Sequence, residues 1–540
     1  MLPRVCDRIV LSAILFLIIF APLAYGGVDP WAQTIIRTVV LLMIIAWLLK
    51  LVYLRDHRIT DLPFWLPALL FLLLVVLQLL PMPIALRIKL SPEPLRHSIL
   101  LPGSPVPGTS GHWTQLSIYP AATWEGLLAF TTCLAFCWVL VNNLRSREAI
   151  RFVVVALLAI AGFEAVYGLV EFWSGRQAIF WFSKVHYREE VTGTYINHNH
   201  LAGLLAMLTP LAAGVAWIKL SQPKGIEGAA RMLSSVGESL PSEPGSEVSR
   251  NRLRPSITRG RTARVWTGGF VKRYWDLALS MGAFTAMLLG LILSFSRGGQ
   301  IACVIAITWL MVSLARQGLI GKNWRSWVCL TVVVGCIVFL FRRDIATRFS
   351  YVVRDAPERL ELWGDGLMIV RDFRFFGTGL GTFKYVLPNY RSKLDFLTVD
   401  GVPRRAVWNF AHNDYLQLLI ECGIIGFGLV LWAGYLTMRT LSHWRQEPAG
   451  RERLILSRSA LAGVIAMLLH SIVDFNLHIP GNALVFATLL SLVLVSSRPS
   501  HLSQRWDDRT RELESSGESS DPARASSGEG SRGHAPGASQ

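Results

Sequence analysis

Apolar residues occur in long stretches along the chain, and shorter polar segments separate them. A helix needs about 20 consecutive apolar residues to cross the hydrocarbon core of a bilayer. The pattern predicts about twelve such helices, and therefore an all-α polytopic membrane protein. The predicted spans are residues 9–26, 34–53, 63–81, 123–141, 151–172, 199–219, 275–294, 299–315, 326–341, 413–438, 455–473 and 481–497.

The composition supports this fold class. Of the 540 residues, 52% are hydrophobic and only 16% are charged, whereas about 25% are charged in soluble domains. The formal net charge of +17 would indicate a nucleic-acid partner in a soluble protein. Here the basic residues lie in loops, where they set orientation and meet anionic lipid, so we expect no nucleic acid.

The short loops indicate how the spans are oriented. With the N-terminus in the cytoplasm, the short cytoplasmic loops contain basic residues such as Arg55, Arg145 and Arg316. The short loops 27–33 and 474–480 on the other side contain neither Lys nor Arg. The positive-inside rule therefore predicts that both termini are cytoplasmic.

The chain divides into three predicted regions. A transmembrane core is expected between an N-terminal group of four spans and a polar tail. The core includes a cytoplasmic insertion rich in Ser, Pro and Gly, which we expect to be disordered like the tail. The regions are residues 1–150 with an external loop at 82–122, residues 151–498 with the insertion at 221–272 and a large external loop at 342–412, and residues 499–540.

Distinctive polar motifs all face the side opposite the cytoplasm in this topology. Their convergence on one compartment is the strongest functional signal, because ionisable groups at a membrane are costly and mark function. The motifs are TYINHNHLAG (194–203), SFSRGG (294–299), RLELW (359–363), RDFRFFGTGLGTF (371–383), AHNDYLQLLIE (411–421) and VDFNLHIPGN (473–482).

Each motif also has a purely structural interpretation. Arg297 can extend to the interface as a snorkelling side chain, and Asn413 or Asp414 can be the N-cap of the tenth span. His412 alone is more often an interfacial hydrogen-bonding residue than a catalyst. The glycines of GTGLGT (377–382) indicate turns and not a dinucleotide loop, because no helix with a suitably placed acidic residue follows.

Two histidines, His198 and His200, flank Asn199 at the start of the sixth span. They suit helix capping, and a metal pair would lack a carboxylate partner nearby in the sequence. No Cys-x-x-Cys pair appears among the seven cysteines, so neither a disulfide framework nor a zinc site is expected. We predict no metal and no cofactor.

Taken together, the motifs favour chemistry on a lipid-linked diphosphate. Arginines at an outer membrane face suit a diphosphate, because a guanidinium binds phosphate oxygens in pairs and stays charged. A histidine near such a headgroup can take a proton from an attacking hydroxyl at neutral pH.

In this combination and order, the motifs resemble those of the O-antigen ligase and polymerase family. SFSRGG at a helix turn, Arg-x-x-x-Trp before a glycine segment, and HNDYLQLLIECG opening a late span are similar to its signature. Asn197 and Asn199 in NHNHLAG resemble the family's Asn-x-Asn element. The resemblance covers roughly residues 150–480.

The resemblance implies a lipid-carrier-dependent, GT-C-like glycosyltransferase of the bacterial inner membrane, working without a metal. Such enzymes move a glycan from undecaprenyl diphosphate to a glycan or glycolipid acceptor outside the cytoplasm. It implies that Arg297 and Arg359 bind the diphosphate and that His412 activates the acceptor hydroxyl. Asn413 and Glu421 are implied to orient the histidine or bind sugar. Ligation, polymerisation and protein glycosylation remain open.

Two other functions compete with this prediction. A flippase or exporter of lipid-linked glycans also suits twelve spans, but it should have polar residues near the bilayer midplane and repeated halves. The polar motifs lie at one face instead, and no internal repeat is evident. The second alternative is a non-catalytic partner of a polysaccharide assembly machine.

Overall fold

The structure is a computed structural model that describes residues 2–54, 59–91, 113–184, 186–221, 277–320, 352–391, 396–399, 402–405, 408–444 and 450–498. Within these residues, nine helices are long and apolar enough to cross a membrane, and two shorter apolar helices are Trp65–Leu79 and Leu277–Leu293. These helices coincide with eleven of the predicted spans. The predicted span 326–341, nearly all of the insertion 221–272 and the tail 499–540 lie outside the described residues. The protein is therefore a mostly helical, polytopic, integral membrane protein.

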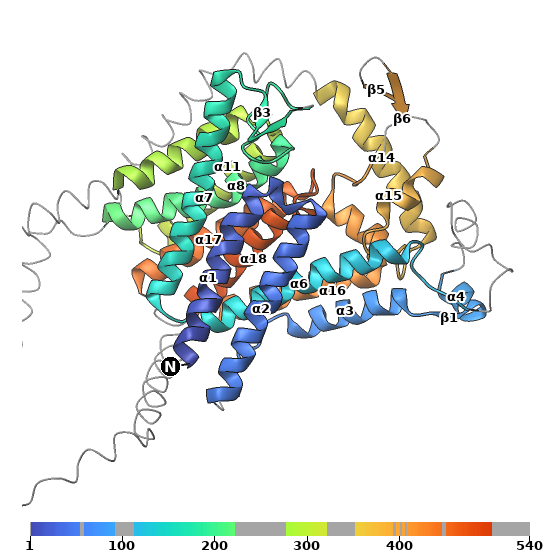
Figure 1. The fold of residues 1–540 in the computed structure, drawn as a ribbon, viewed down its shortest axis with the longest axis horizontal. Helices are drawn as coiled ribbons and strands as arrows, with labels where there is room; N and C mark the ends of the chain where they lie inside the picture. The colour runs from blue at the N-terminus through green and yellow to red at the C-terminus, as the bar shows by residue number, and fades with distance from the viewer. Residues whose placement is uncertain are drawn as a thin grey trace, which may run out of the picture.

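The main bundle surrounds a central helix, α8 (Figure 1). Of its most apolar window, 78% is buried, against 28% for α2 at the edge. Helix α8 contacts α7, α11, α17 and α18, and α1 and α2 pack beside them. The bounds are α1 (Leu2–Leu23), α2 (Pro30–Leu54), α6 (Pro120–Asn143), α7 (Arg147–Ser174), α8 (His198–Ser221), α11 (Arg297–Arg316), α17 (Arg451–His470) and α18 (Pro480–Ser497).

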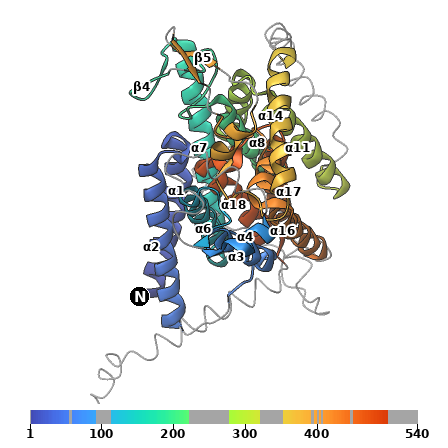
Figure 2. The same cartoon turned by 90° about the vertical axis from the view of Figure 1, so that its right-hand side faces the viewer.

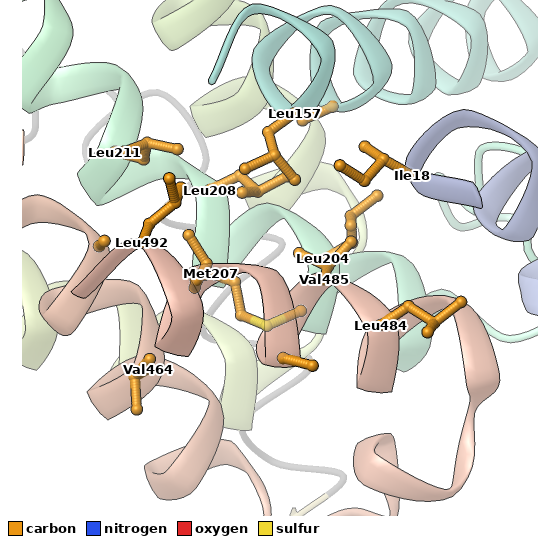
Figure 3. Packing of buried hydrophobic residues seen from close by; sticks show 14 of the residues in the cluster. Ile18, Leu157, Leu204, Met207, Leu208, Leu211, Val464, Leu484, Val485 and Leu492 are labelled. Atoms are coloured by element: carbon orange, nitrogen blue, oxygen red, sulfur yellow. The ribbon is translucent and has the colours of Figure 1, made fainter. Parts of the chain in front are cut away.

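Interlocking aliphatic side chains fill the centre of the bundle. Figure 3 shows Leu204 and Met207 of α8 among Leu157 of α7, Ile18 of α1 and Val485 of α18. The side chains of all five residues are fully buried. Small residues let the helices approach closely, as is usual where lipid supplies no hydrophobic driving force between helices.

A second group of helices packs beside the main bundle. Helix α3 (Trp65–Leu79) lies along α16 (Asp414–Trp444), and α14 (Val352–Asp372) contacts the N-terminal part of α16. Figures 1 and 2 show α3, α6 and α16 close together and α14 at the far edge of this group. Helix α14 and the short helix α15 (Phe383–Val386) lie inside the predicted external loop 342–412, where no helix was expected.

Strands contribute only three small antiparallel pairs in the described residues. They connect helices and do not form a larger sheet. The pairs are β1 (Met82–Pro83) with β2 (Trp113–Thr114), β3 (Ala178–Ile179) with β4 (Phe182–Ser183), and β5 (Phe396–Val399) with β6 (Val402–Arg405). The short helix α4 (Ile84–Leu90) follows β1, and the 3-10 turns are η1 (Tyr25–Gly27), η2 (Leu387–Asn389) and η3 (Asn476–His478).

Helix α16 is interrupted at Gly423, which has φ 63° and ψ −171°. The chain after α14 pairs with the backbone on both sides of the interruption. Thr378 N–H donates to Ile420 O (3.0 Å), and Ile424 N–H donates to Arg374 O (2.8 Å). The polar backbone groups freed by the break are thus satisfied within the protein, as non-helical backbone at membrane depth requires.

The two ends of the main bundle differ in charge. At one end, arginines donate to backbone carbonyls near helix C-termini: Arg498 to Val141 O, Arg453 to Val495 O, and Arg451 to Leu319 O, each at 3.2 Å. Cations are stabilised at these positions by the partial negative charge of a helix C-terminus. The polar motifs lie at the opposite end of the bundle.

Replacing Gly423 with Ala should destabilise the protein by more than about 1 kcal/mol. A Cβ at this position would collide with the carbonyl oxygen of Phe375, and its positive φ disfavours any L side chain. Gly428→Ala in the same helix is the matched control, because a Cβ there meets nothing within 4 Å. Thermal unfolding in detergent measures the difference. Equal melting temperatures for the two variants would contradict the interrupted helix.

Candidate functional site

The site is organised by the turn between α17 and α18, residues 471–479, which we call the α17–α18 turn. Asp414 N–H at the start of α16 donates to Ser471 O at 2.9 Å. Arg359 Nη1 of α14 donates to Val473 O, also at 2.9 Å. Residues more than 50 positions apart in the sequence therefore meet at one end of the bundle.

Two glycines allow α11 to begin against this turn. A Cβ on Gly298 would lie 2.5 Å from Val473 Cγ2 and 3.0 Å from His470 Cδ2. A Cβ on Gly299 would lie 2.9 Å from the Cβ of Ala202. Because both glycines lack a Cβ, Arg297 at the first position of α11 comes next to the α17–α18 turn. The glycine pair of SFSRGG thus allows close helix packing, in addition to the turn expected from the sequence.

His412 faces a buried carboxylate in this turn. Its Nδ1 lies 3.6 Å from Asp474 Oδ1, an ion-pair contact in which the side chain of His412 is 20% exposed and that of Asp474 is 2% exposed. His412 has φ 50°, a conformation that is strained for a non-glycine residue. The imidazole packs edge-on against Phe475, with ring centroids 4.8 Å apart. Such strain at a tightly surrounded residue is typical of functional sites.

Histidines surround the Asp474 carboxylate. Burial raises the pKa of Asp474, but the contact with His412 and the neighbouring imidazoles of His470 and His200 outweigh it, so the pKa lies well below its usual range. His470 Nε2 is 3.8 Å from Asp474 Oδ2. Asp474 is therefore an anion that can orient a neighbouring imidazole and stabilise its protonated form.

A second His–Asp pair links the turn to α16. His478 Nδ1 contacts Asp414 Oδ1 at 2.7 Å, and Leu477 N–H donates to Asp414 Oδ2 at 3.2 Å. Burial alone would lower the pKa of His478, but the hydrogen bond and charge of Asp414, with the charge of Glu421, raise it. Asp414 is thus a tether between α16 and the turn.

Asn413 is the N-cap of α16. Its Oδ1 accepts hydrogen bonds from the N–H groups of Tyr415 (3.1 Å) and Leu416 (3.0 Å), which confirms the capping interpretation for Asn413. Since Asn413 follows His412 directly, the cap also fixes where α16 begins relative to the histidine.

Glu421 is hydrogen-bonded to the glycine loop, residues 377–382. Its Oε2 accepts from Gly381 N–H at 2.7 Å, and its Oε1 accepts from Phe383 N–H at 3.2 Å. Gly377, Gly379 and Gly381 all have positive φ, which confirms that these glycines form turns. The described contacts of Glu421 thus fix the loop, and orientation of the histidine or sugar binding by Glu421 stays a prediction.

The segment before α8 supplies the remaining predicted residues. Asn197 Oδ1 accepts from Asn199 N–H at 2.9 Å, so Asn197 caps the helix start. Asn199 is half-buried in the first turn of α8. His198 Nδ1 contacts Ser294 O at 2.5 Å and thereby links α8 to the SFSRGG turn. The structure therefore brings the NHNHLAG and SFSRGG motifs together.

Sequence reasoning singled out no site residue in the α17–α18 turn, although it named the VDFNLHIPGN motif. Asp474, His470 and His478 all belong to the site. Tyr187 was missed as well: its ring lies 4.6 Å from that of His198. Burial and the charges of Asp474 and Glu190 raise the pKa of Tyr187 and Arg359 lowers it, so Tyr187 also borders the site. The available signal was the density of polar residues in one short interhelical turn.

Within the described residues, no group of three or more His, Cys, Asp or Glu side chains is arranged to hold a metal ion. His200 does have a carboxylate nearby in space, Asp474, although none is close in the sequence.

The fold and site define a helical membrane protein with a His–Asp pair and two arginines at one end. Residues 282–431 match the family model described as O-antigen ligase, which confirms the resemblance given by the motifs. The matched segment contains Arg297, Arg359, His412, Asn413 and Glu421. No curated protein matches the chain. The family match favours O-antigen ligase- or polymerase-type activity.

The His478–Asp414 pair predicts a pH-dependent stability. Because the pKa of His478 is raised in the folded protein, the pair stabilises the fold fully below the usual value of 6.5 and loses this effect as pH rises through the raised pKa. His478→Asn keeps a side-chain donor but removes the charge. We expect it to lower the free energy of unfolding by about 1–2 kcal/mol at most at pH 5.5, and much less at pH 9. The melting temperature in detergent at the two pH values measures this difference.

Asp414→Asn should reproduce this pH window, because it removes the other partner of the pair. A deficit of His478→Asn that is the same at both pH values would show that the charge of His478 contributes nothing.

Proposed function

We propose that the protein moves a glycan from a polyprenyl (undecaprenyl) diphosphate donor to an acceptor hydroxyl on the extracytoplasmic face of the bacterial inner membrane. It acts as an O-antigen ligase or a surface polysaccharide polymerase. The observation that carries the proposal is the contact of His412 with buried Asp474. At the same end of the bundle, Arg297 begins α11 and Arg359 is bonded to the α17–α18 turn.

In the proposed reaction, His412 is the general base. With Nδ1 facing Asp474, Nε2 is the ring nitrogen left to meet the acceptor hydroxyl. The hydroxyl oxygen attacks the anomeric carbon, and its proton passes to Nε2. The bond from the anomeric carbon to the diphosphate oxygen breaks, and polyprenyl diphosphate leaves with the electron pair. Asp474 stabilises the resulting imidazolium, in the way an aspartate supports the histidine of a hydrolase triad.

The arginines are proposed to bind the diphosphate and stabilise the charge that develops on it. The hydrogen bond from Arg359 Nη1 to Val473 O anchors the side chain. A guanidinium has five N–H donors, so this bond uses only one of the donors that can bind phosphate oxygens. Fixed cations aimed at a leaving group supply the kind of electrostatic stabilisation that a metal would otherwise give. We therefore propose that transfer needs no divalent metal.

The extracytoplasmic placement rests on the two ends of the bundle. Arg451, Arg453 and Arg498 lie at the end opposite to His412. The positive-inside rule assigns an arginine-rich end to the cytoplasm. The headgroup of a lipid-linked donor in the outer leaflet would then lie at the depth of His412. The family match gives no support to the flippase alternative.

Removing the proposed base should abolish most of the transfer. His412→Ala is expected to lower kcat by about 100- to 10,000-fold, the usual contribution of a general base. The assay uses purified protein, a defined polyprenyl diphosphate-linked glycan and EDTA, and it measures both product and released polyprenyl diphosphate. His443→Ala, at the far end of α16, is the matched control and should transfer at the wild-type rate.

Wild-type activity that EDTA abolishes and added Mg²⁺ restores would refute metal-free transfer. Donor that crosses vesicle membranes uncleaved would favour transport instead.

Replacing Arg359 with Ala should reduce kcat/KM by about 100-fold or more, as removal of a single stabilising donor does in other enzymes. Arg359→Lys keeps the charge but loses the paired donors, so we expect intermediate activity. Arg391→Lys in the same external region serves as control, because Arg391 is bonded to Asp365 within the α14–η2 region. Unchanged transfer by Arg359→Ala would show that Arg359 does not bind the diphosphate.

A further inference from the structure

A chain of buried hydrogen bonds leads from Tyr195, in the segment before α8, to His470, which faces the carboxylate of Asp474. Tyr195 Oη donates to Asn482 Oδ1 at 3.0 Å, and Asn482 Nδ2 donates to Asn476 Oδ1 at 2.9 Å. Asn476 Nδ2 lies 3.3 Å from His470 Nδ1. Tyr195, Asn476 and Asn482 are 0% exposed and His470 is 1% exposed. The family match at 282–431 includes none of these four residues.

The direction of every bond in the chain follows from its neighbours. Asn482 Nδ2 also donates to His200 O at 2.9 Å, which fixes that amide with its nitrogen toward two acceptors. Asn476 Oδ1 must then accept from Asn482, so Asn476 turns its NH2 group toward His470. An NH2 group can only donate. His470 Nδ1 therefore accepts and carries no proton.

A neutral imidazole whose Nδ1 accepts has its proton on Nε2. His470 Nε2 is the atom that faces Asp474 Oδ2, 3.8 Å away. The other carboxylate oxygen, Oδ1, faces His412 Nδ1 at 3.6 Å. Asp474 thus lies between two histidines, and only one of them is held by a donor on its far side.

We propose that the Tyr195–Asn482–Asn476 chain is a positioning device that keeps His470 neutral and protonated on Nε2. The negative charge of Asp474 is then reserved for His412. Without the chain, either histidine could take the proton released by the acceptor hydroxyl, and a charged His470 would consume the counter-charge that His412 needs. The catalytic part of this inference rests on the proposed function, whereas the protonation state of His470 does not.

The NHNHLAG motif contributes the space that the chain needs. A Cβ on Gly203 would collide with the Oδ1 of Asn476, so glycine at this position leaves room for the amide. The motif was singled out in the sequence for its asparagines, but its glycine supports the turn 273 residues later. This contact explains why a small residue follows the polar start of a tightly packed helix.

Other ionisable groups also face His470. Asp414 of α16, His198 and His200 of α8, and Arg359 of α14 are close enough to interact with it electrostatically. Asp414 is already paired with His478. The tests below therefore change His470 or Asn476 and leave these neighbours in place.

The first measurement concerns the wild-type protein and needs no catalysis. ¹⁵N solid-state NMR of histidine-labelled protein in lipid distinguishes the Nε2–H, Nδ1–H and doubly protonated forms of a ring. Subtracting the spectrum of His470→Gln assigns the His470 signals. We expect the neutral Nε2–H form at pH 7. A proton on Nδ1, alone or with Nε2, would overturn the proposal even if transfer proceeds.

Transfer kinetics give the second measurement. The amide of His470→Gln can donate to Asp474 and cannot be protonated, so we expect kcat within about threefold of wild type. His470→Leu offers no donor, and kcat should fall at least about tenfold with little change in KM. If His470→Gln is as inactive as His470→Leu, His470 itself carries a proton in the reaction and the proposal is wrong.

Asn476→Asp tests the direction of the chain. A carboxylate at this position accepts from His470 Nδ1–H and makes His470 doubly protonated. A protonated His470 then competes with His412 for Asp474, so we expect the acid limb of the kcat profile to move to lower pH, by about half a pH unit or more. An unshifted acid limb in a protein that melts like wild type would refute the device. If neither the wild type nor any variant cleaves the donor while NMR finds the Nε2–H form of His470, the proposed function is wrong. The inferred protonation state of His470 then still holds.

Discussion

The α17–α18 turn depends on one constraint: its backbone carbonyls lie inside a helical membrane protein and must be paired there. Asp474, Asn476 and Ser471 are 0–1% exposed, and an unpaired polar group at such a place costs several kcal/mol. The partners come from other elements, with Asp414 from α16 and Arg359 from α14. Satisfying this one turn therefore draws together the starts of the helices that carry the candidate chemistry.

The interruption of α16 solves a second problem of the same kind. A continuous helix would leave the chain after α14 without backbone partners at membrane depth. Gly423 opens the helix, and Glu421 accepts from Gly381 in the glycine loop and from Phe383 at the start of α15. Gln78 of α3 joins them, because its Nε2 donates to Phe376 O at 2.7 Å and to Glu421 O at 2.9 Å. The sequence spacing between Glu421 and His412 thus reflects loop support, with the histidine two and a half turns away.

The sequence predicts those features of the structure that neighbouring residues encode, and misses those that depend on contacts between distant residues. Apolar runs are local, so the spans were predictable, and the motifs predicted that Arg297, Arg359 and His412 lie on the same side of the membrane. Helix α14 was missed because it is polar on average and lies in a segment expected to be a loop. Asp474 was not singled out because an aspartate in a short turn is also an ordinary turn residue. Its value comes from burial beside His412, which no local pattern encodes.

The electrostatics of the site also explain why Asp474 should be buried in the proposed reaction. A carboxylate that stabilises an imidazolium would also repel a diphosphate. Two like unit charges about 8 Å apart repel each other by about 2 kcal/mol at an effective dielectric constant of about 20. Asp474 is 1% exposed and lies behind His412, whose side chain is 20% exposed. The donor would therefore meet an imidazole and two guanidinium groups first. A neutral His470 on the other side leaves the anion with a single cationic partner, so that its charge offsets the proton taken by His412.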